Sequence, residues 1–398
     1  MKDNQAKYPQ LRFKGFTDPW EQRKLIEVAD YRNGKAHEKD ISENGDYIVV
    51  NSKFVSTNGA VKKFSDELIA PLKKGELAFV LSDVPNGRAI ARTFLIDEDN
   101  KYSLNQRIAG IAPHSDTNSY FLHSLMNRHH YFLRFDDGAG QTNLSKKEVE
   151  NWTELYPSIE EQDKIGSFFK QLDDTITLHQ RKLAKLKELK QGYLQKMFPQ
   201  NASKFPQLRF AGFADAWEQR NFGELYKKNL ERNKDQFSSD RTISIATMRF
   251  KKEGNGAAED SLVSYKVLRE GDIAFEGHTS KRFAFGRFVL NDIGDGIMSP
   301  RFTTLRPTQD MPIKFWKQYI HYEPIMRYPI VNSTKLGTMM NELVVDEFLN
   351  QPVLVPELSE QQKIGSFFKQ LDGTITLHQR KLEKLQELKK GYLQKMFC

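Results

Sequence analysis

The sequence predicts an α+β protein built as two pseudo-symmetric copies of one arrangement, a mixed α/β domain followed by a long helix. Three observations predict it: a sequence repeat, helical periodicity in part of that repeat, and short β-rich runs between the repeated parts. We expect the mixed domains at 1–156 and 200–355. We expect the helices at 157–199 and 356–398, paired as an antiparallel coiled coil.

The first repeated segment is an apolar and aromatic motif at the start of each copy. Residues 9–25 read PQLRFKGFTDPWEQRKL and residues 206–222 read PQLRFAGFADAWEQRNF. We call these two segments the LRF motifs. The second repeated segment spans residues 164–198 and recurs at 363–397 with four changes in 35 positions. The repeat therefore preserves the beginning and the end of each copy.

The segments between the repeated parts have similar lengths and little sequence in common. They run from about 26 to 156 and from about 223 to 355. A duplicated catalytic site would be expected to repeat its reactive residues. A constant frame with different middles instead indicates one scaffold that displays two different binding surfaces.

The second repeated segment has apolar residues at three-to-four spacing with Lys and Glu between them, which predicts a helix of about 50 Å in each copy. Ser158 and Ser359 are the predicted N-cap residues. Seven-residue spacings continue the apolar stripe and predict that the two helices pair. The residues expected to mediate pairing are Leu172, Ile176, His179, Leu183, Leu186, Ile375, His378, Leu382 and Leu385.

The two middles combine β-rich runs with helical patterns. Helices are expected at about 117–134 and 312–328. Gly, Asn and Asp turns separate the β-rich runs, which predicts a twisted or barrel-like sheet with a few helices in each middle. The predicted strands include 47–50, 77–80, 93–96, 272–275 and 287–290.

Composition and charge restrict the function further. The chain has 398 residues, a formal net charge of +8 and a pI near 9.1, which favours a polyanionic partner. Its single cysteine, Cys398, cannot form an internal disulfide, which fits a reducing compartment. No apolar run approaches the length of a membrane span, so we expect a cytoplasmic protein without a membrane partner.

Motifs for catalysis are missing from the sequence. It contains neither a methyltransferase tetrapeptide with its glycine-rich loop nor a phosphate-binding loop ending in Gly-Lys-Ser/Thr. Asp83 with Asp99, Asn100 and Lys101 superficially resembles the carboxylates and lysine of a metal-dependent nuclease. The second copy has no lysine there, and the string is typical of a hairpin turn. We therefore expect no catalytic residue and no metal site in this chain.

The motifs together resemble the specificity subunits of type I restriction-modification systems. The resemblance is carried by the LRF motifs, by the lead-ins at 157–162 and 356–361, and by the repeated helices. The string GAGQTNLS at 138–145 adds to it. One departure is that residues 337–343 of the second copy keep only the outer Gly and Leu of that string.

The resemblance implies a division of labour between this chain and its partners. Each middle would be a target recognition domain that reads one half of a bipartite double-stranded DNA sequence. The paired helices would set the spacer and dock two methyltransferase subunits, which carry S-adenosylmethionine, whereas this chain holds no cofactor. Nuclease and translocase subunits would complete the restriction enzyme.

Side chains with the right chemistry for reading DNA cluster in each middle, because Arg, Asn and Gln form paired hydrogen bonds with base edges. Solvent-facing charge is the alternative interpretation of each single residue. An interaction scaffold, with a coiled coil and domains that bind something other than DNA, is the alternative function. The candidate readers are Arg88, Arg92, Asn105, Gln106, Arg107, Gln141 and Asn143 in the first copy, and His278, Ser280, Lys281, Arg282, Arg287 and Arg301 in the second.

Overall fold

The computed structural model describes residues 8–37, 41–84, 87–200, 203–280, 283–338 and 340–397. The chain forms two compact units. Unit 1 comprises Met1–Gln180 with Arg380–Cys398, and unit 2 comprises Arg181–Gln379. Each unit therefore contains one variable middle, the first part of one long helix and the last part of the other.

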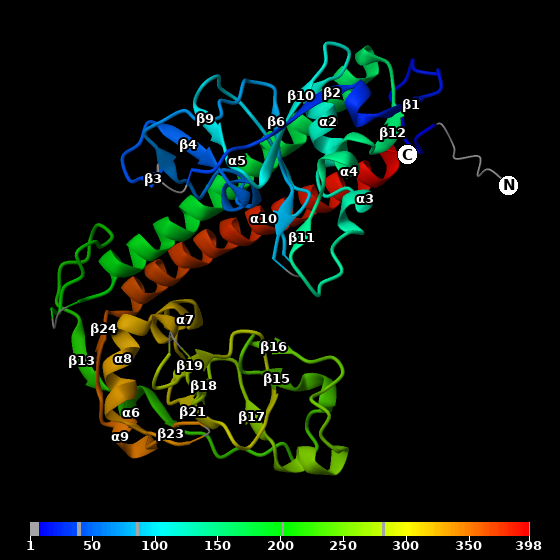
Figure 1. Cartoon of the computed structure of the whole chain (residues 1–398). Coiled ribbons are helices and arrows are strands. Elements are labelled where there is room, and N and C mark those ends of the chain that lie inside the picture. Colours follow the sequence, from blue (N-terminus) through cyan, green and yellow to red (C-terminus); the bar gives the residue numbers. More distant parts are fainter. Residues whose placement is uncertain are drawn as a thin grey trace. The chain divides into compact units, whose positions relative to one another are not determined.

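Unit 1 is organised around a four-stranded antiparallel sheet of order β2-β10-β6-β8 (Figure 1). Its two inner strands are almost wholly buried because apolar side chains point to both faces. A second four-stranded sheet, of order β3-β5-β4-β9, contains one parallel pair, β4 with β9. The strands of the two sheets are β2 (Ala29–Asn33), β10 (Ile108–Pro113), β6 (Leu77–Val80), β8 (Thr93–Leu95), β3 (Ile41–Ser42), β5 (Phe64–Ser65), β4 (Tyr47–Val50) and β9 (Tyr102–Leu104).

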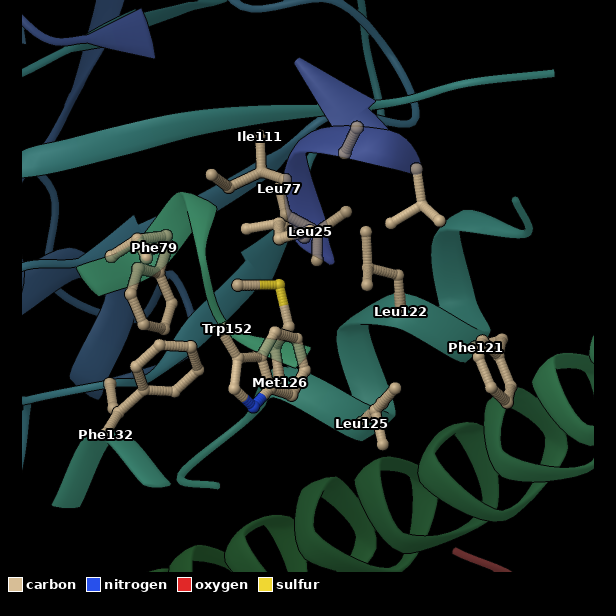
Figure 2. Packing of buried hydrophobic residues seen from close by; sticks show 14 of the residues in the cluster. Leu25, Leu77, Phe79, Ile111, Phe121, Leu122, Leu125, Met126, Phe132 and Trp152 are labelled. Carbon is tan, nitrogen blue, oxygen red and sulfur yellow. The ribbon is translucent and has the colours of Figure 1, made fainter. Parts of the chain in front are cut away.

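Helices cover the first sheet and close the core of unit 1. Figure 2 shows Leu122 and Met126 of one helix packed toward the sheet residues Leu77 and Ile111. Two short strand pairs lie outside the sheets. These elements are α1 (Ser52–Ser56), α2 (Ser119–Met126), α3 (His130–Leu133), α4 (Lys146–Glu150), η1 (Leu25–Glu27), and the pairs β1 (Glu21–Lys24) with β12 (Thr153–Tyr156) and β7 (Ser82–Asp83) with β11 (Thr142–Asn143).

Unit 2 repeats the first sheet of unit 1 with the same connections. Its order is β14-β21-β18-β19, again antiparallel throughout. The bounds are β14 (Tyr226–Lys228), β21 (Thr303–Pro307), β18 (Ile273–Glu276) and β19 (Arg287–Leu290). The other strand pairs are β13 (Glu218–Asn221) with β24 (Pro352–Val355), β15 (Ile243–Ser244) with β16 (Arg249–Phe250), β17 (Lys266–Leu268) with β20 (Gly296–Met298), and β22 (Thr334–Lys335) with β23 (Glu342–Leu343).

The helices of unit 2 follow the same order as those of unit 1. The segments expected as single helices at 117–134 and 312–328 are each two helices, because the chain leaves helical geometry at Asn127 and at Tyr322. The expected strands are present, with shifts of one residue at three ends. The bounds are α6 (Phe222–Leu225), η2 (Ser239–Arg241), η3 (Glu259–Ser264), α7 (Ile313–His321), α8 (Glu323–Asn332) and α9 (Val345–Leu349).

The long helices are α5 (Ile159–Met197) and α10 (Leu358–Met396). Within unit 1 the first half of α5 runs antiparallel to the last half of α10, and Lys389 Nζ lies 2.7 Å from Asp173 Oδ2 (Figure 1). Within unit 2 the equivalent pair joins Lys190 Nζ to Asp372 Oδ1 at 2.7 Å. These pairs confirm the predicted antiparallel coiled coil and the pseudo-symmetric α+β fold.

In each unit the LRF motif forms hydrogen bonds with both long helices. Arg12 donates two hydrogen bonds, of 2.8 and 2.7 Å, to the carboxylate of Glu161 in the first turn of α5. The backbone of Leu11 donates to the carbonyl of Lys395 near the end of α10. In unit 2, Arg209 binds Glu360 in the same way. Both carboxylates have almost no exposure, so the motif and the helix start form one buried unit.

A glycine in each long helix lets a helix of the middle approach closely. A Cβ at Gly166 would lie 2.4 Å from the side-chain oxygen of Asn118, the N-cap of α2. A Cβ at Gly365 would lie 2.7 Å from the backbone nitrogen of Phe315 in α7. Because such contacts are too short for a real Cβ, both positions require glycine. The repeated helices therefore dock the variable middles in the same way.

One predicted helix cap is wrong. Ser158 precedes α5 as expected, and its carbonyl accepts from Gln162. The equivalent position before α10 is Glu357, whose carbonyl accepts from Gln361, and Ser359 lies inside the first turn. The two lead-ins therefore correspond by position relative to the helix start, so Ser158 corresponds to Glu357 and not to Ser359. No helix in the described part of the chain is long and apolar enough to cross a membrane.

Candidate nucleic-acid interface

Four loops of unit 1 meet where strand β6 ends. The backbone of Leu81 donates to the carbonyl of Arg107, and Gln141 Nε2 donates to Ser82 Oγ at 2.7 Å. The backbone of Asn105 donates to the carbonyl of Val50, just before α1. We call residues 51–52, 81–84, 105–107 and 141–143 loop cluster 1.

The same loops meet at the end of β18 in unit 2. Phe275 pairs with Thr303, and continuing this antiparallel register places Gly277 beside Arg301. The backbone of Asn341 donates to the carbonyl of Gly277, as the β11 segment does to Leu81 in unit 1. We call residues 245–247, 277–280, 299–301 and 340–343 loop cluster 2.

Arg107 and Arg301 occupy equivalent positions in the two loop clusters. Each is the third residue of a turn that leads into the central strand. The turns close with hydrogen bonds from Ile108 to Asn105, at 3.0 Å, and from Phe302 to Ser299, at 3.2 Å. Both arginines are exposed, and in the described part of the chain neither forms an ion pair. The sequence indicated both residues but not their equivalence, because their surroundings share no motif.

The amides predicted in unit 1 also hold loop cluster 1 together. Gln141 and Asn143 are exposed and lie on the segment that carries β11, with Asn143 Nδ2 3.4 Å from the carbonyl of Gln141. Asn105 is half-buried and begins the turn of Arg107, whereas Gln106 is exposed. In the second copy Asn341, whose backbone donates to Gly277, is 3% exposed, and its side chain donates to the carbonyl of Ala284.

Arg92 of unit 1 and Arg287 of unit 2 are equivalent in their sheets but differ in electrostatics. Arg92 precedes β8 and is half-buried, and its Nε donates to the carbonyl of Arg88 at 2.5 Å. Burial and the positive charges of Arg128 and Arg88 lower the pKa of Arg92. Arg287 instead binds Glu276 at 2.7 Å. Sequence reasoning missed Arg128, which follows α2 without any motif.

The remaining candidates of unit 2 lie in the loop after β18. His278 and Ser280 are exposed, and Ser280 Oγ accepts from the backbone of Phe283 at 3.1 Å. Lys281 and Arg282 lie outside the described residues.

Arg301 stands over the ring of Phe302 at 4.7 Å. Lys266 donates to the Phe302 carbonyl, and burial with the nearby charges of Arg232 and Lys228 lowers the pKa of Lys266. Loop cluster 2 therefore adjoins a group of cations.

The helix-pairing candidates lie along the buried side of the long helices. His179 is 7% exposed and Leu382 is 8% exposed. Leu189, which continues the predicted stripe, is instead 45% exposed. The buried candidates are Ile176, His179, Leu183 and Leu382, and the half-buried ones are Leu172, Leu186, Ile375, His378 and Leu385.

The carboxylates considered as nuclease ligands have separate structural roles. Asp83 accepts from the backbones of Ala89 and Ile90, so it fixes the loop that carries Arg88. Asp99 accepts from the backbone of Lys74 at 2.7 Å, and Lys101 pairs with Glu98. In the described ranges, no three His, Cys, Asp or Glu residues are grouped so that they could hold a metal ion.

Unit 2 also contains a cavity of about 800 Å³ beside β19. Apolar side chains, among them Met248, Phe285 and Met326, line it together with the cations Arg249 and Arg287. The backbone of Leu290 donates to Nε2 of His321, which also faces the cavity. The lining also contains Asp292 and Glu323, so the cavity combines apolar side chains with charges of both signs.

Comparison with known proteins identifies the family. The model of the type I restriction modification DNA specificity domain matches twice, at residues 17–188 and 215–387. The chain is 22% identical over 292 residues to the specificity subunit of the type I restriction enzyme MjaVIII of Methanocaldococcus jannaschii, covering 68% of this chain and 67% of that protein. A crystal structure of a type I restriction-modification S subunit from M. genitalium has the same fold, with a TM-score of 0.65, 14% identity, and coverage of 98% and 99% of the two chains. The chain belongs to the family of type I restriction-modification specificity subunits, with one specificity domain in each repeat.

Proposed function

We propose that this chain is the sequence-specific DNA-binding specificity subunit of a type I restriction-modification enzyme, and that each recognition domain reads one half of a bipartite target. The observation that carries the proposal is the duplicated loop cluster, with Arg107 and Arg301 at equivalent positions on different sequences. Two surfaces with one geometry and different side chains suit two half-sites with different bases.

The chemistry of the two arginines supports base reading. A guanidinium group offers two parallel donors, which match the two acceptors of guanine in the major groove. Exposed arginines without a carboxylate partner keep these donors available. Asn105 and Gln141 supply amide groups beside Arg107, and amides pair with adenine. Backbone phosphates would fix the position of the domain, and these side chains would choose the bases.

The repeated helices suit a spacer between the half-sites. The helix residues and their ion pairs recur in both copies, so the helices contribute equally to both sides. For a two-fold arrangement on DNA, half-site centres lie about 34 Å apart. Removing one heptad from both α5 and α10 should change the tolerated spacer, whereas an unchanged spacer would contradict this role.

The outer faces of the helices suit two copies of a protein partner. Leu178 and Leu377 occupy equivalent positions and are 51% and 65% exposed, and Leu189 and Leu388 are 45% and 42% exposed. Duplicated apolar positions fit a partner that binds twice. We propose that two methyltransferase subunits dock here and supply S-adenosylmethionine, while nuclease and translocase subunits complete the enzyme. This chain is then a non-catalytic subunit.

One observation favours a different function. The cavity of unit 2 is large enough for a small ligand, which fits a coiled-coil scaffold whose domains bind something other than DNA. Binding to duplex DNA with a steep negative salt dependence separates the two functions, because only phosphate contacts release counterions. A salt-independent interaction, or none, would favour the scaffold.

The decisive experiment maps methylation in cells that produce this chain with its methyltransferase partner. Arg107→Ala should relax one base position in one half-site, at a cost of about 1–3 kcal/mol in binding the original base. Arg301→Ala should relax a position in the other half-site only. Arg220→Ala is the control, since that arginine pairs with Glu218 on β13. A uniform loss on all sequences would identify phosphate contacts and contradict base reading.

A further inference from the structure

Three arginines of unit 1 form a group of like charge beside the loop that Asp83 fixes. They are Arg88, Arg92 and Arg128. Arg92 Nε donates to the carbonyl of Arg88 at 2.5 Å, and a terminal nitrogen of Arg128 donates to the carbonyl of Ile90 at 3.3 Å. These backbone contacts hold the side chains of Arg92 and Arg128 in place, and the side chain of Arg88 is exposed. Each guanidinium group has more donors than these contacts use.

The backbone holds this group together at some cost. Ala91 and Arg128 both have left-handed conformations, with φ of 56° and 60°. The amide of Arg128 donates to the carbonyl of Ala91 at 2.7 Å, so the two strained residues support each other. Left-handed geometry is unfavourable for both residue types and persists where the surroundings impose it. The hydrogen bond between these residues joins the end of α2 to the turn that carries Arg92.

The charges of the group are not neutralised within the described residues. The charged groups that act on Arg92 are Arg128 and Arg88, and no carboxylate there forms an ion pair with any of the three. Arg92 and Arg128 are half-buried, which weakens their hydration. At the equivalent positions in the described part of unit 2, Tyr322 replaces Arg128 and Arg287 is paired with Glu276.

We infer that Arg88, Arg92 and Arg128 form an oxyanion site that binds a backbone phosphate of duplex DNA, and that only the first recognition domain has it. A phosphate would bring the negative charge that the group lacks and would accept from several guanidinium donors. The site deepens the proposed function and rests on it. It would hold the first domain on DNA whatever the base sequence.

The test uses the chain assembled with its methyltransferase partner and a double variant, Arg92→Gln with Arg128→Asn. Asn suits the left-handed position, so the backbone is retained. Dissociation constants are measured over a salt series on a target duplex and on a duplex with both half-sites scrambled. The slope of log affinity against log salt should become shallower by about 0.9 for each lost contact, equally on both duplexes. Arg220→Gln should leave the slope unchanged. Arg128→Lys in a chain that keeps Arg92 should give a slope close to that of the wild type.

Inorganic phosphate distinguishes a DNA phosphate from a free oxyanion. At constant ionic strength, phosphate should raise the melting temperature of the wild-type chain more than that of the double variant. An unchanged DNA slope with a lost phosphate effect would overturn the DNA assignment, and no change in either measurement would overturn the site. A loss confined to the target duplex would instead identify base readers. If the wild-type complex failed to bind DNA, the proposed function would fail, and the phosphate measurement would still test the site.

Discussion

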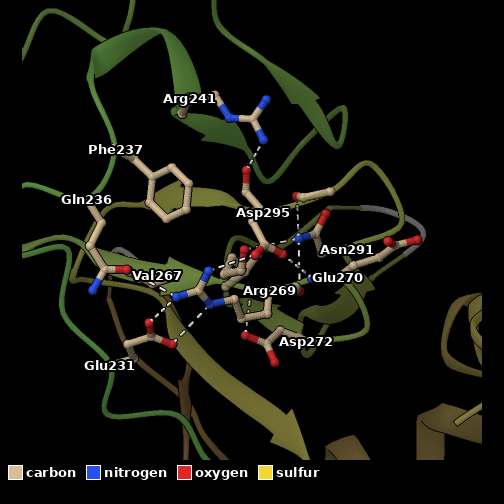
Figure 3. Close-up of polar contacts among 12 residues, drawn as sticks. Glu231, Gln236, Phe237, Arg241, Val267, Arg269, Glu270, Asp272, Asn291 and Asp295 are labelled. Atoms are coloured by element: carbon tan, nitrogen blue, oxygen red, sulfur yellow. Dashed lines mark hydrogen bonds and ion pairs between the residues drawn. The ribbon is translucent and has the colours of Figure 1, made fainter. Parts of the chain in front are cut away.

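The two recognition domains share one sheet topology but differ in where they place their charges. In unit 2, Arg269 lies between Glu231 and Asp295 (Figure 3). Arg306 binds the fully buried Asp272. In unit 1 the equivalent of Asp272 is Glu76, which pairs with a single arginine, Arg32.

Surface arginines show the opposite distribution. Arg287 of unit 2 is neutralised by Glu276, whereas Arg92 of unit 1 is crowded by other arginines. Unit 2 thus uses ion pairs to join its sheets, and unit 1 leaves cations available at its surface. One scaffold therefore tolerates opposite charge arrangements, since the sheet and the helix contacts do not depend on them.

The largest expected difference concerns the buried carboxylates. Asp272→Asn should destabilise unit 2 by about 1.5–3 kcal/mol, because Arg306 loses its charge-assisted hydrogen bonds to the buried carboxylate while it keeps its ion pair with Glu231. Glu76→Gln should cost about 1 kcal/mol, since the side chain of Arg32 is 37% exposed. Hydrogen exchange measured peptide by peptide reports the two units separately. Equal losses would show that the two networks are energetically alike.

Acid should destabilise unit 1 through His123, whose position in unit 2 is occupied by a lysine. His123 lies 2.9 Å from Thr93 Oγ1, and burial lowers its pKa to about 4. The unfolded chain binds the proton near pH 6.5 and the folded chain does not, so stability is retained above pH 6.5 and falls as the pH drops toward 4. The loss should be on the order of 2 kcal/mol, allowing for partial exposure.

Unfolding of the wild type and of His123→Gln at pH 7 and pH 4.5 measures this effect. Gln keeps a polar group near Thr93 without titrating, so the variant should show a smaller drop between the two pH values. Lys317 stands at the position in α7 equivalent to His123 and pairs with Asp292. The matched change in unit 2 is Lys317→Arg, which keeps the positive charge beside His321 and should leave the pH dependence as it is. A drop of equal size in His123→Gln would assign the acid sensitivity to other groups.

Unit 2 should gain an unpaired surface arginine, as unit 1 has, when Arg287 is released from its carboxylate partner. Glu276→Gln removes the carboxylate that binds Arg287, and the free guanidinium should add about one phosphate contact. The salt dependence of DNA binding by the assembled methyltransferase should then steepen by about 0.9. Glu218→Gln, which releases Arg220 on β13, is the control. An unaltered slope in Glu276→Gln would place Arg287 away from the DNA backbone.

The smallest expected effect concerns the ion pairs between the long helices, which both units contain. Asp173 accepts from Tyr120 and Lys389, and Asp372 accepts from Gln318 and Lys190. Asp173→Asn and Asp372→Asn should each cost about 0.5–1 kcal/mol, since these pairs are partly exposed. Chemical denaturation followed by hydrogen exchange compares the two variants. Clearly unequal effects would show that the helices are not equivalent on their two sides.

The sequence by itself determined the repeated architecture. The periodicity of the helices is a local pattern, and its physical cause is an apolar stripe. The LRF motifs are also local patterns, and their physical cause is a buried ion pair such as Arg12–Glu161. Both causes recur in the second copy because the residues recur there. Strands β4, β6, β8, β18 and β19 were predicted for the same reason, because short apolar runs between turns are local signals.

Only the tertiary structure decided which residues of the middles belong together. The equivalence of Arg107 with Arg301, and of Arg92 with Arg287, follows from strand register and not from any shared motif. Arg128 joins Arg92 through a left-handed turn after α2, which no periodicity signals. Contacts between segments far apart in the chain depend on how the sheets pair, and the sequence fixes that pairing only through the whole fold.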